Sequence, residues 1–399
     1  MRHSRRGIIH LPSNTFVASL QQQRNDPEAL IYLNNAKVHA RNLSVLHIAV
    51  SVPIGSNLNV AQEILRGVAQ AQDEINAKGG INQAGLAVAI ADDANDPDLA
   101  KQIATAFVKN DQILGVIGHN ASNASLAAAP IYQQGRLVMI SPTSFAETLS
   151  GGSYIFRTVP ATRAIAARLA EYVAKTAQKP DVVMCYDSQA PDNVSFKDEF
   201  VASFGSLGGR LVPMVCDFAS PTFSSRAAIQ EALSRGAKGL VLSPHVDRIG
   251  KAIELARVNQ GQLPLFSSPS LYTIQTLKEG QSNISGLVLP AVWHPQTYPN
   301  SQFPLLARRR WGGEVSWRTA MSYDAAQALS TGLQHQTRSG LQQALRSYSF
   351  SAMGVGEAVR FDPQTGDRQL PIQLVKVQPT NSSQSGTGFD FVPVDLVSR

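Results

Sequence analysis

The chain has 399 residues, of which 43% are hydrophobic and 16% charged, and its formal net charge is +6. This balance is typical of a globular protein with a substantial core and excludes an intrinsically disordered chain. The length is sufficient for two or three globular units. Basic residues are dispersed rather than gathered in one motif, so we do not expect a nucleic-acid-binding protein.

The N-terminal segment begins with basic residues, and no stretch of the chain approaches the roughly 18 consecutive apolar residues of a membrane-spanning helix. The apolar residues near the start are interrupted by His10, Pro12 and Asn14. This pattern is a poor match to a secretory signal peptide. We expect residues 1–43 to form an N-terminal extension that is partly helical or disordered.

Only two cysteines are present, Cys185 and Cys216. Two thiols cannot form a four-ligand metal site, and they do not resemble the disulfide framework of a small secreted domain. Each ends an apolar run. We therefore expect two buried free thiols, with a bridge between neighbouring strands as the alternative, and no metal site.

From residue 45 onward, apolar runs of strand length alternate with segments that have helical periodicity. Residues 62–78 form one such amphipathic segment, which Gly79 and Gly80 end. Alternation of this kind predicts βαβ units and parallel sheets. One parallel sheet of this length would be unusual, so we expect two α/β lobes, with a change near residues 154–162. The predicted helices cover 62–78, 97–110, 126–134, 163–178, 196–204, 224–235, 247–259, 323–334 and 341–347.

Small polar residues follow two neighbouring predicted strands. HNASNAS at 119–125 precedes a helix, and Ser-Pro-Thr-Ser at 141–144 ends the next strand. In parallel α/β sheets ligands bind beyond the carboxyl ends of strands, where helix N-termini favour anions. Ser122, Asn123 and Ser125 could donate to a carboxylate there. The alternative is ordinary helix capping followed by a turn.

Motifs for catalysis or cofactor binding are not visible. His119 and Ser122 are close in sequence, but GHNAS is not a G-x-S-x-G nucleophile elbow. No acidic residue lies near His119 in sequence, which leaves only a distant one to orient it. Glycine-rich motifs for a dinucleotide or a nucleoside triphosphate are missing. The acidic run at 92–96 lacks the glycine and the distal glutamate of a calcium loop. We expect no enzymatic activity and no cofactor.

Six segments along the chain carry a family resemblance. They are RGVAQAQDEINAKGGIN at 66–82, the acidic run at 92–97, GVIGHNASNAS at 115–125, VMISPTS at 138–144, YIFRTVP at 154–160 and SYDAAQAL at 322–329. In this order and spacing they resemble the type I periplasmic binding proteins, in particular the branched-chain amino-acid-binding branch of ABC importers. The resemblance covers roughly residues 44–378. Residues 25–38 also resemble the lead-in of cyanobacterial members.

The resemblance implies an α/β fold with two Rossmann-like lobes that have parallel sheets and are joined by a multi-strand hinge. It places the crossings between lobes near Val159, Leu289 and Ser351. The implied boundaries are 44–160 with 288–350 for lobe I, 161–287 with 351–378 for lobe II, and 379–399 for a mobile tail.

The resemblance also implies a ligand site between the lobes. Ser122 matches the hydroxyl that receives the carboxylate of the ligand, and Thr143 and Phe145 match the pair that completes this grip. Ser144 and Tyr272 are further expected ligand-binding residues. The small polar entry to the helix would then leave its N–H groups open to an anion.

Several positions depart from the family pattern. Phe145 stands where a hydroxyl is expected, and Val60 replaces an aromatic residue. Asp192 stands where an aromatic residue usually covers the ligand, and Pro269 or Ser270 falls where an acidic residue pairs with the ligand ammonium. Because an unpaired buried charge costs about 2–5 kcal/mol, either Asp192 supplies the missing charge or the ligand is not an α-amino acid.

The function implied by the resemblance is that of a monomeric, periplasmic solute-binding component of an amino-acid ABC importer, with permease subunits as partners. The alternative is a ligand-sensing domain of a signalling system, because the same fold serves receptors and fold alone does not decide function.

Overall fold

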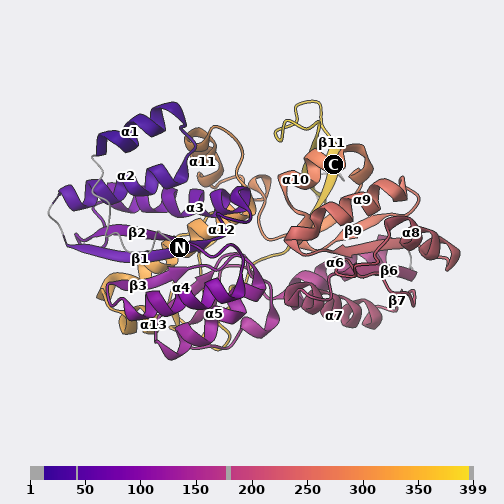
Figure 1. The fold of residues 1–399 in the computed structure, drawn as a ribbon, viewed down its shortest axis with the longest axis horizontal. Helices are drawn as coiled ribbons and strands as arrows, with labels where there is room; N and C mark the ends of the chain where they lie inside the picture. Colours follow the sequence, from indigo (N-terminus) through magenta and orange to yellow (C-terminus); the bar gives the residue numbers. More distant parts are fainter. Residues whose placement is uncertain (1–12, 42–43, 177–180, 395–399) are drawn as a thin grey trace.

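The computed structural model describes residues 13–41, 44–176 and 181–394. Within this part of the chain, two α/β lobes lie side by side, each built on one sheet (Figure 1). The first sheet has five parallel strands in the order β2-β1-β3-β4-β5. Its strands are β1 Val45–Val52, β2 Gly85–Asp92, β3 Ile113–Ile117, β4 Val138–Ser141 and β5 Ile155–Arg157.

The helices of the first lobe follow from periodicity and local end signals. The side chain of Asn57 accepts a hydrogen bond from the N–H of Val60 and caps α3 (Leu58–Ala77). Gly80 follows this helix with a positive φ, and a Cβ there would lie 2.0 Å from the Ala84 carbonyl oxygen. Only glycine fits this turn. The next two helices are α4 (Pro97–Lys109) and α5 (Ser122–Gln134).

The second sheet has seven strands in the order β12-β11-β10-β9-β8-β6-β7. The strands from β6 to β10 are parallel, and the last two are added antiparallel at one edge. The strands are β6 Asp181–Tyr186, β7 Arg210–Leu211, β8 Gly239–Ser243, β9 Leu265–Ser267, β10 Val288–Ala291, β11 Gln373–Pro379 and β12 Phe389–Pro393. The helices are α6 Thr162–Thr176, α7 Pro191–Ser206, α8 Ser225–Ser234, α9 Ile249–Asn259 and α10 Ile274–Gly280.

After β10 the chain returns to the first lobe through α11 (Phe303–Trp311), α12 (Trp317–Gly332) and α13 (Arg338–Leu345), and it later adds β11 and β12 to the second sheet. Helix α12 is almost entirely buried and packs tightly on α3. A Cβ on Gly67 of α3 would lie only 2.2 Å from the Thr319 carbonyl oxygen. The first lobe is therefore discontinuous in sequence.

Two lobe boundaries differ from those expected. Strand β10 pairs with β9 through Val288 and Phe266, so it belongs to the second sheet and not to lobe I. Residues 352–368 pack on the first lobe, where the Arg157 Nε lies 2.7 Å from Asp367 Oδ1 and Arg368 pairs with buried Asp324. The last crossing therefore comes after Arg368 rather than at Ser351, because buried ion pairs hold this segment.

The end of the chain also corrects an expectation. The segment from residue 379 was expected to be a mobile tail, but residues 389–393 form β12, which pairs along β11 from Val375 to Pro379. Phe391 is buried and packs edge-on against Tyr272, with ring centroids 4.6 Å apart. Two phenylalanines that follow a polar stretch thus anchor the strand.

The N-terminal extension adds two helices, α1 (Ser13–Gln22) and α2 (Pro27–Ala40), to the first lobe. The Asn35 side chain donates to the Val88 carbonyl at 2.8 Å and accepts from the Val88 N–H at 2.9 Å. Val88 lies on edge strand β2, so α2 covers a sheet edge that would otherwise expose unpaired backbone groups. Residues 1–12 and 42–43 of the expected extension lie outside the described residues.

The two cysteines are joined in a disulfide, so the expectation of two free thiols is wrong. Cys185 is in β6, and Cys216 lies in a segment that follows the short strand β7. A parallel bridge between Tyr186 and Asp217 places the next residues of both segments side by side. This pairing brings the two sulfur atoms together. The sequence alone was compatible with two free thiols or with a bridge.

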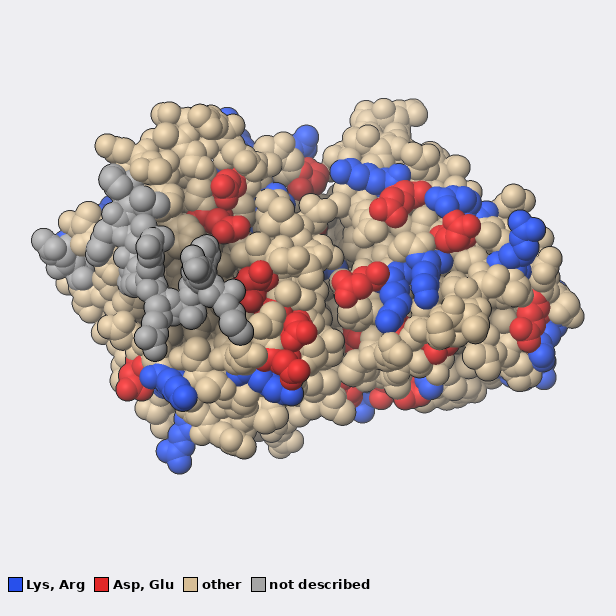
Figure 2. Space-filling model, viewed as in Figure 1, with Lys and Arg blue, Asp and Glu red and all other residues tan. Residues whose placement is uncertain are grey.

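Acidic and basic side chains are interspersed over both lobes on the face that Figure 2 shows, and a furrow separates the lobes there. In the described ranges no helix is both long and apolar enough to cross a membrane.

Candidate ligand-binding site

A small cavity lies between the lobes, beyond the carboxyl ends of strands from both sheets. Its volume is about 30 Å³, which is close to the share of one water molecule in the liquid. The lobes therefore approach each other closely at this point. The cavity is lined by Asn120, Ala121, Ser122, Thr143 and Phe145 from the first sheet, Asp192, His245, Val246 and Ser270 from the second lobe, and Trp317 and Arg318 from α12.

Ser122 begins α5 and lines this cavity as expected from the sequence. The residue before it is Ala121, so this helix start has no side-chain cap. The Ser144 hydroxyl donates to Ser122 Oγ at 3.0 Å, which leaves the Ser122 proton free to donate elsewhere. Within the described chain, the N–H groups of Ser122 and Asn123 have no hydrogen-bond partner. These donors, together with the positive end of the helix, can hold an anion.

Thr143 and Phe145 line the cavity, but they have different capacities. The Thr143 hydroxyl already donates to the Asn120 carbonyl at 2.9 Å, so it can accept but not donate a further hydrogen bond. The ring of Phe145 packs on Trp317, with centroids 5.6 Å apart. Its N–H has no partner in the described ranges. Thr143 therefore holds the entry loop, whereas Phe145 offers both a donor and an apolar wall.

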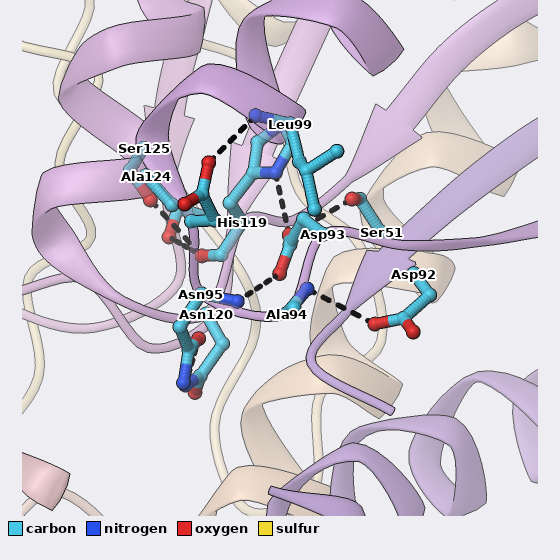
Figure 3. A network of polar contacts seen from close by, with 12 residues as sticks. Ser51, Asp92, Asp93, Ala94, Asn95, Leu99, His119, Asn120, Ala124 and Ser125 are labelled. Atoms are coloured by element: carbon cyan, nitrogen blue, oxygen red, sulfur yellow. Dashed lines mark hydrogen bonds and ion pairs between the residues drawn. The ribbon is translucent and has the colours of Figure 1, made fainter. Parts of the chain in front are cut away.

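A buried polar network lies directly beneath the start of α5 (Figure 3). Asp93 Oδ2 accepts from the Ser51 hydroxyl at 2.9 Å and lies 2.6 Å from His119 Nδ1. His119 Nε2 lies 3.1 Å from the Tyr132 hydroxyl. The sequence shows no acidic residue near His119 and left only a distant one open. Asp93 is that residue: it follows β2, His119 follows β3, and Ser51 of the intervening strand β1 donates to Asp93.

This network fixes the loop that carries the anion-binding groups. The His119 carbonyl accepts from the hydroxyls of Ser125 and Ser141, at 3.0 and 3.1 Å. Burial raises the pKa of Asp93, but hydrogen bonds to its charged form, led by that of His119, lower the pKa to below its usual value. Both His119 and Asp93 are fully buried, so they support the site without contacting a ligand.

Asp192 faces the cavity from the first turn of α7 in the second lobe. Its Oδ1 atom is buried and has no hydrogen-bond partner in the described chain. Burial raises the pKa of Asp192 above its usual value, although the charge of His245 lowers it in part. Burial lowers the pKa of His245, but Asp247 and the charge of Asp192 raise it by more, so this pKa lies above its usual value. Backbone hydrogen bonds from Asp192 and Asn193 to this carboxylate also lower the pKa. The Oδ1 atom of Asp192 is thus a buried acceptor without a partner in the described chain.

Three other positions that the resemblance singled out do not line the cavity. Ser144 bonds to Ser122 rather than lining the cavity. Val60 is buried in the core of the first lobe. The ring of Tyr272 packs against His294 and Phe391, so this side chain points away from the cavity, where we had expected it. Ser270 does line the cavity, at the position where the family has an acidic residue.

Trp317, Arg318 and His245 were missed by the sequence reasoning. Arg318 is buried, stacks on the Trp317 ring at 4.6 Å from its centroid, and lies 3.3 Å from Glu63 Oε2. Burial lowers the pKa of Arg318, whereas Glu63 raises it in part. None of the three lies in a recognised motif. The Ser316 cap marks the helix start that carries Trp317 and Arg318, whereas His245 comes from a distant part of the chain.

No group of three or more His, Cys, Asp or Glu side chains is placed to hold a metal ion in the ranges that the structure describes.

Comparison with known proteins identifies the family. The model of the family described as "Periplasmic binding protein" matches residues 46–385. An "Amino acid binding protein" from Pseudomonas aeruginosa is 23% identical over 280 residues, which are 69% of this chain and 74% of that protein. The "Leu/Ile/Val-binding protein" of Escherichia coli K12 is 31% identical over 163 residues, which are 40% of this chain and 43% of that protein.

Solved structures show the same fold. A leucine-binding protein from Thermotoga maritima has a TM-score of 0.76 at 20% identity and covers 87% of this chain and 97% of its own. A solute-binding protein of an ABC transporter from Rhodopseudomonas palustris, in complex with 3,4-dihydroxybenzoic acid, has a TM-score of 0.72 at 16% identity, with coverages of 88% and 96%. The chain therefore belongs to the periplasmic binding protein family, and it shares its fold with a leucine-binding protein.

Proposed function

We propose that this protein binds a small amino acid between its lobes as the solute-binding component of an ABC importer. One observation carries the proposal: unpaired donors at the start of α5 and the unpaired, buried Oδ1 atom of Asp192 border one cavity. An α-amino acid carries a carboxylate and an ammonium group close together. Donors on one lobe and an acceptor on the other match this pair of charges.

The first lobe supplies the carboxylate grip. The N-terminus of a helix stabilises a negative group by roughly 0.3–1 kcal/mol, and by up to about 2 kcal/mol when partly buried. Each hydrogen bond to a charged group adds about 1.5–3 kcal/mol before the costs of association. The donors are the N–H groups of Ser122, Asn123 and Phe145 and the Ser122 hydroxyl.

The second lobe supplies the ammonium partner. Pro269 and Ser270 carry no charge, so Asp192 is the acidic group that lines this cavity. Phe145 and Trp317 form an apolar wall that suits a neutral side chain. The named ligands of the related proteins, which include leucine, support an apolar amino acid.

A second ligand class is favoured by one feature of the site. The raised pKa of Asp192 favours its neutral form, which tolerates a ligand that has no ammonium group. The Rhodopseudomonas palustris structure, with its bound aromatic acid, shows that this fold can accommodate such a carboxylate.

The disulfide supports a location outside the cytosol, because disulfides persist in oxidising compartments such as the periplasm. Permease subunits remain the expected partners, and a monomer remains the expected state. A sensing domain would share the ligand site but not the transport partner.

Isothermal titration calorimetry of the full chain tests the proposed function. The ligands are leucine, isoleucine, alanine, 4-methylpentanoate and 3,4-dihydroxybenzoate. We expect heat with at least one amino acid and little with the matching deaminated acid. Binding of the two carboxylates without any amino acid would replace the amino-acid proposal with the second ligand class. Uptake that depends on this protein in cells would distinguish transport from sensing.

A further inference from the structure

A groove on the first lobe, separate from the ligand cavity, is lined by four helical elements. It has a volume of about 720 Å³ and lies between the N-terminal helices, the C-terminal end of α3 and α11. None of its lining residues borders the cavity between the lobes. The residues are Leu20, Arg24, Leu30, Glu74, Ala77, Lys78, Leu306, Arg309 and Arg310.

The floor of the groove is apolar. Leu30 is buried, Leu20 is half-buried, and Leu306 is 44% exposed although it is a large aliphatic residue. A neighbouring cavity of about 530 Å³ shares Leu306 and Lys78 and extends the same surface toward Met353, which is 67% exposed. Leu306 and Met353 are therefore exposed apolar side chains along two adjoining hollows, and exposed apolar surface with a polar rim is typical of an interaction site.

The rim of the groove is basic. Arg24, Lys78 and Arg309 are exposed, and none of them forms an ion pair or side-chain hydrogen bond in the described part of the chain. Arg310 pairs with Asp73. The acidic residue Glu74 accepts hydrogen bonds from Gln70 at 3.1 Å and from the Tyr323 hydroxyl at 2.6 Å. Three unpaired cations therefore surround the apolar floor. A partner with complementary charge would carry negative groups.

One wall of the groove belongs to the extension that precedes the family match. Leu20 and Leu30 come from α1 and α2, whereas the match begins at residue 46. These helices lie at the same end of the first lobe as α11 (Figure 1). The groove is therefore a feature that this chain adds to the family fold.

We propose that this groove binds an acidic amphipathic helix of a partner protein. The walls are helices, so they offer no free strand edge to an extended peptide, whereas a helix satisfies its own backbone hydrogen bonds. Leucine-type side chains on one face of the partner helix would cover Leu20, Leu30 and Leu306. Carboxylates on its flanks would pair with Arg24, Lys78 and Arg309. A membrane surface fits less well, because a flat surface reaches the rim but not the floor.

Two labelled synthetic peptides test this proposal in fluorescence anisotropy with the full-length protein. Both are amphipathic helices with leucines on one face; one carries glutamates on its flanks, and its twin carries lysines at the same positions. We expect the glutamate peptide to bind at least tenfold more tightly, and its binding to weaken as salt is added, because exposed charges are screened.

A charge reversal provides the decisive comparison. The double variant Lys78→Glu/Arg309→Glu should lose about tenfold in affinity for the glutamate peptide and gain affinity for the lysine peptide. Lys238→Glu changes an equally exposed lysine in the second lobe and should have no effect. Leu306→Ser should weaken both complexes, and thermal unfolding confirms that each variant is folded.

Three results would overturn the proposal. The first is equal affinity of wild-type protein for both peptides, or no binding of either. The second is a loss with Lys238→Glu as large as that of the double variant. The third is binding to phosphatidylglycerol vesicles that depends on Arg309 while neither peptide binds, which would assign the rim to a membrane surface.

Discussion

The Ser144 hydroxyl donates to Ser122 Oγ at 3.0 Å, and this bond directs the remaining Ser122 proton away from Ser144. Ser144 thus acts through Ser122 and needs no contact with the ligand. Ser144 lies just beyond the end of β4, and Ser122, which is 22 positions earlier in sequence, begins α5. Their contact connects the polar cluster at 141–144 with the polar cluster at 119–125.

Replacing Ser122 by alanine should weaken amino-acid binding about ten- to a hundredfold, because one hydrogen bond to a charged group is worth about 1.5–3 kcal/mol. Calorimetry measures the loss. The fold should persist, since this side chain does not cap its helix. Ser144→Ala is the matched control and should cost less, because it leaves the Ser122 donor in place. Equal affinity of wild type and Ser122→Ala would place the carboxylate elsewhere.

Replacing Asp192 by asparagine should separate ligand classes. If its carboxylate pairs with the ligand ammonium, Asp192→Asn should weaken binding of amino acids about ten- to a hundredfold and change binding of the deaminated acids little. Calorimetry with leucine and 4-methylpentanoate gives both values. Losses of the same size for both ligands would remove Asp192 from the ammonium site.

The raised pKa of Asp192 also predicts an effect on the ligand-free protein. The folded state keeps a proton on Asp192 at pH values where the unfolded chain has released it. Stability therefore falls as the pH rises from the usual value of 3.8 through the raised pKa. Asparagine cannot ionise, so Asp192→Asn should be more stable than wild type at pH 7 and similar at low pH.

Urea unfolding across this pH range checks the stability prediction, with Asp198→Asn as a control because Asp198 is an exposed residue of the same helix. A wild-type protein that is more stable than Asp192→Asn at pH 7, without ligand, would contradict it.

Breaking the disulfide should destabilise the protein. Cys185 and Cys216 are 31 positions apart, and closing a loop of this size in the unfolded chain is worth about 3–4 kcal/mol in the chain-entropy model. Urea unfolding with and without reductant, and of Cys185→Ala/Cys216→Ala, measures the difference. Reductant should have no effect on the double variant. An unchanged unfolding midpoint for wild type in reductant would argue against this contribution.

The close approach of the lobes predicts hinge motion. A cavity of about 30 Å³ cannot hold an amino acid, so the lobes must separate before a ligand enters. Because the chain crosses between the lobes at only a few segments, rotation there can open and close the cleft. We expect small-angle scattering to show a smaller radius of gyration at saturating ligand. An unchanged radius would contradict hinge closure.

Much of the fold was determined by local sequence patterns. The alternation of apolar runs with amphipathic segments predicted most strands and helices of both lobes, because periodicity records which face of each element is buried. Helices α10 and α11 were not among the predicted helices. The end of α3 at Gly79 and Gly80 was also predictable from local sequence. Both glycines have positive φ, which few other residues adopt. The family resemblance, rather than a local pattern, assigned Ser122, Thr143, Phe145 and Asp192 to one ligand site. These residues line one cavity, and their contact with a ligand stays a prediction.

Tertiary structure decided what depends on contacts between distant segments. Asp93 reaches His119 across 26 positions, and Cys185 reaches Cys216 because strand pairing aligns their segments. Arg318 enters the cavity at the start of α12, although no motif surrounds it. A buried ion pair likewise keeps Asp367 with the first lobe. Local patterns specify which residues are buried, but the partner of each buried polar group is set only when the chain has folded.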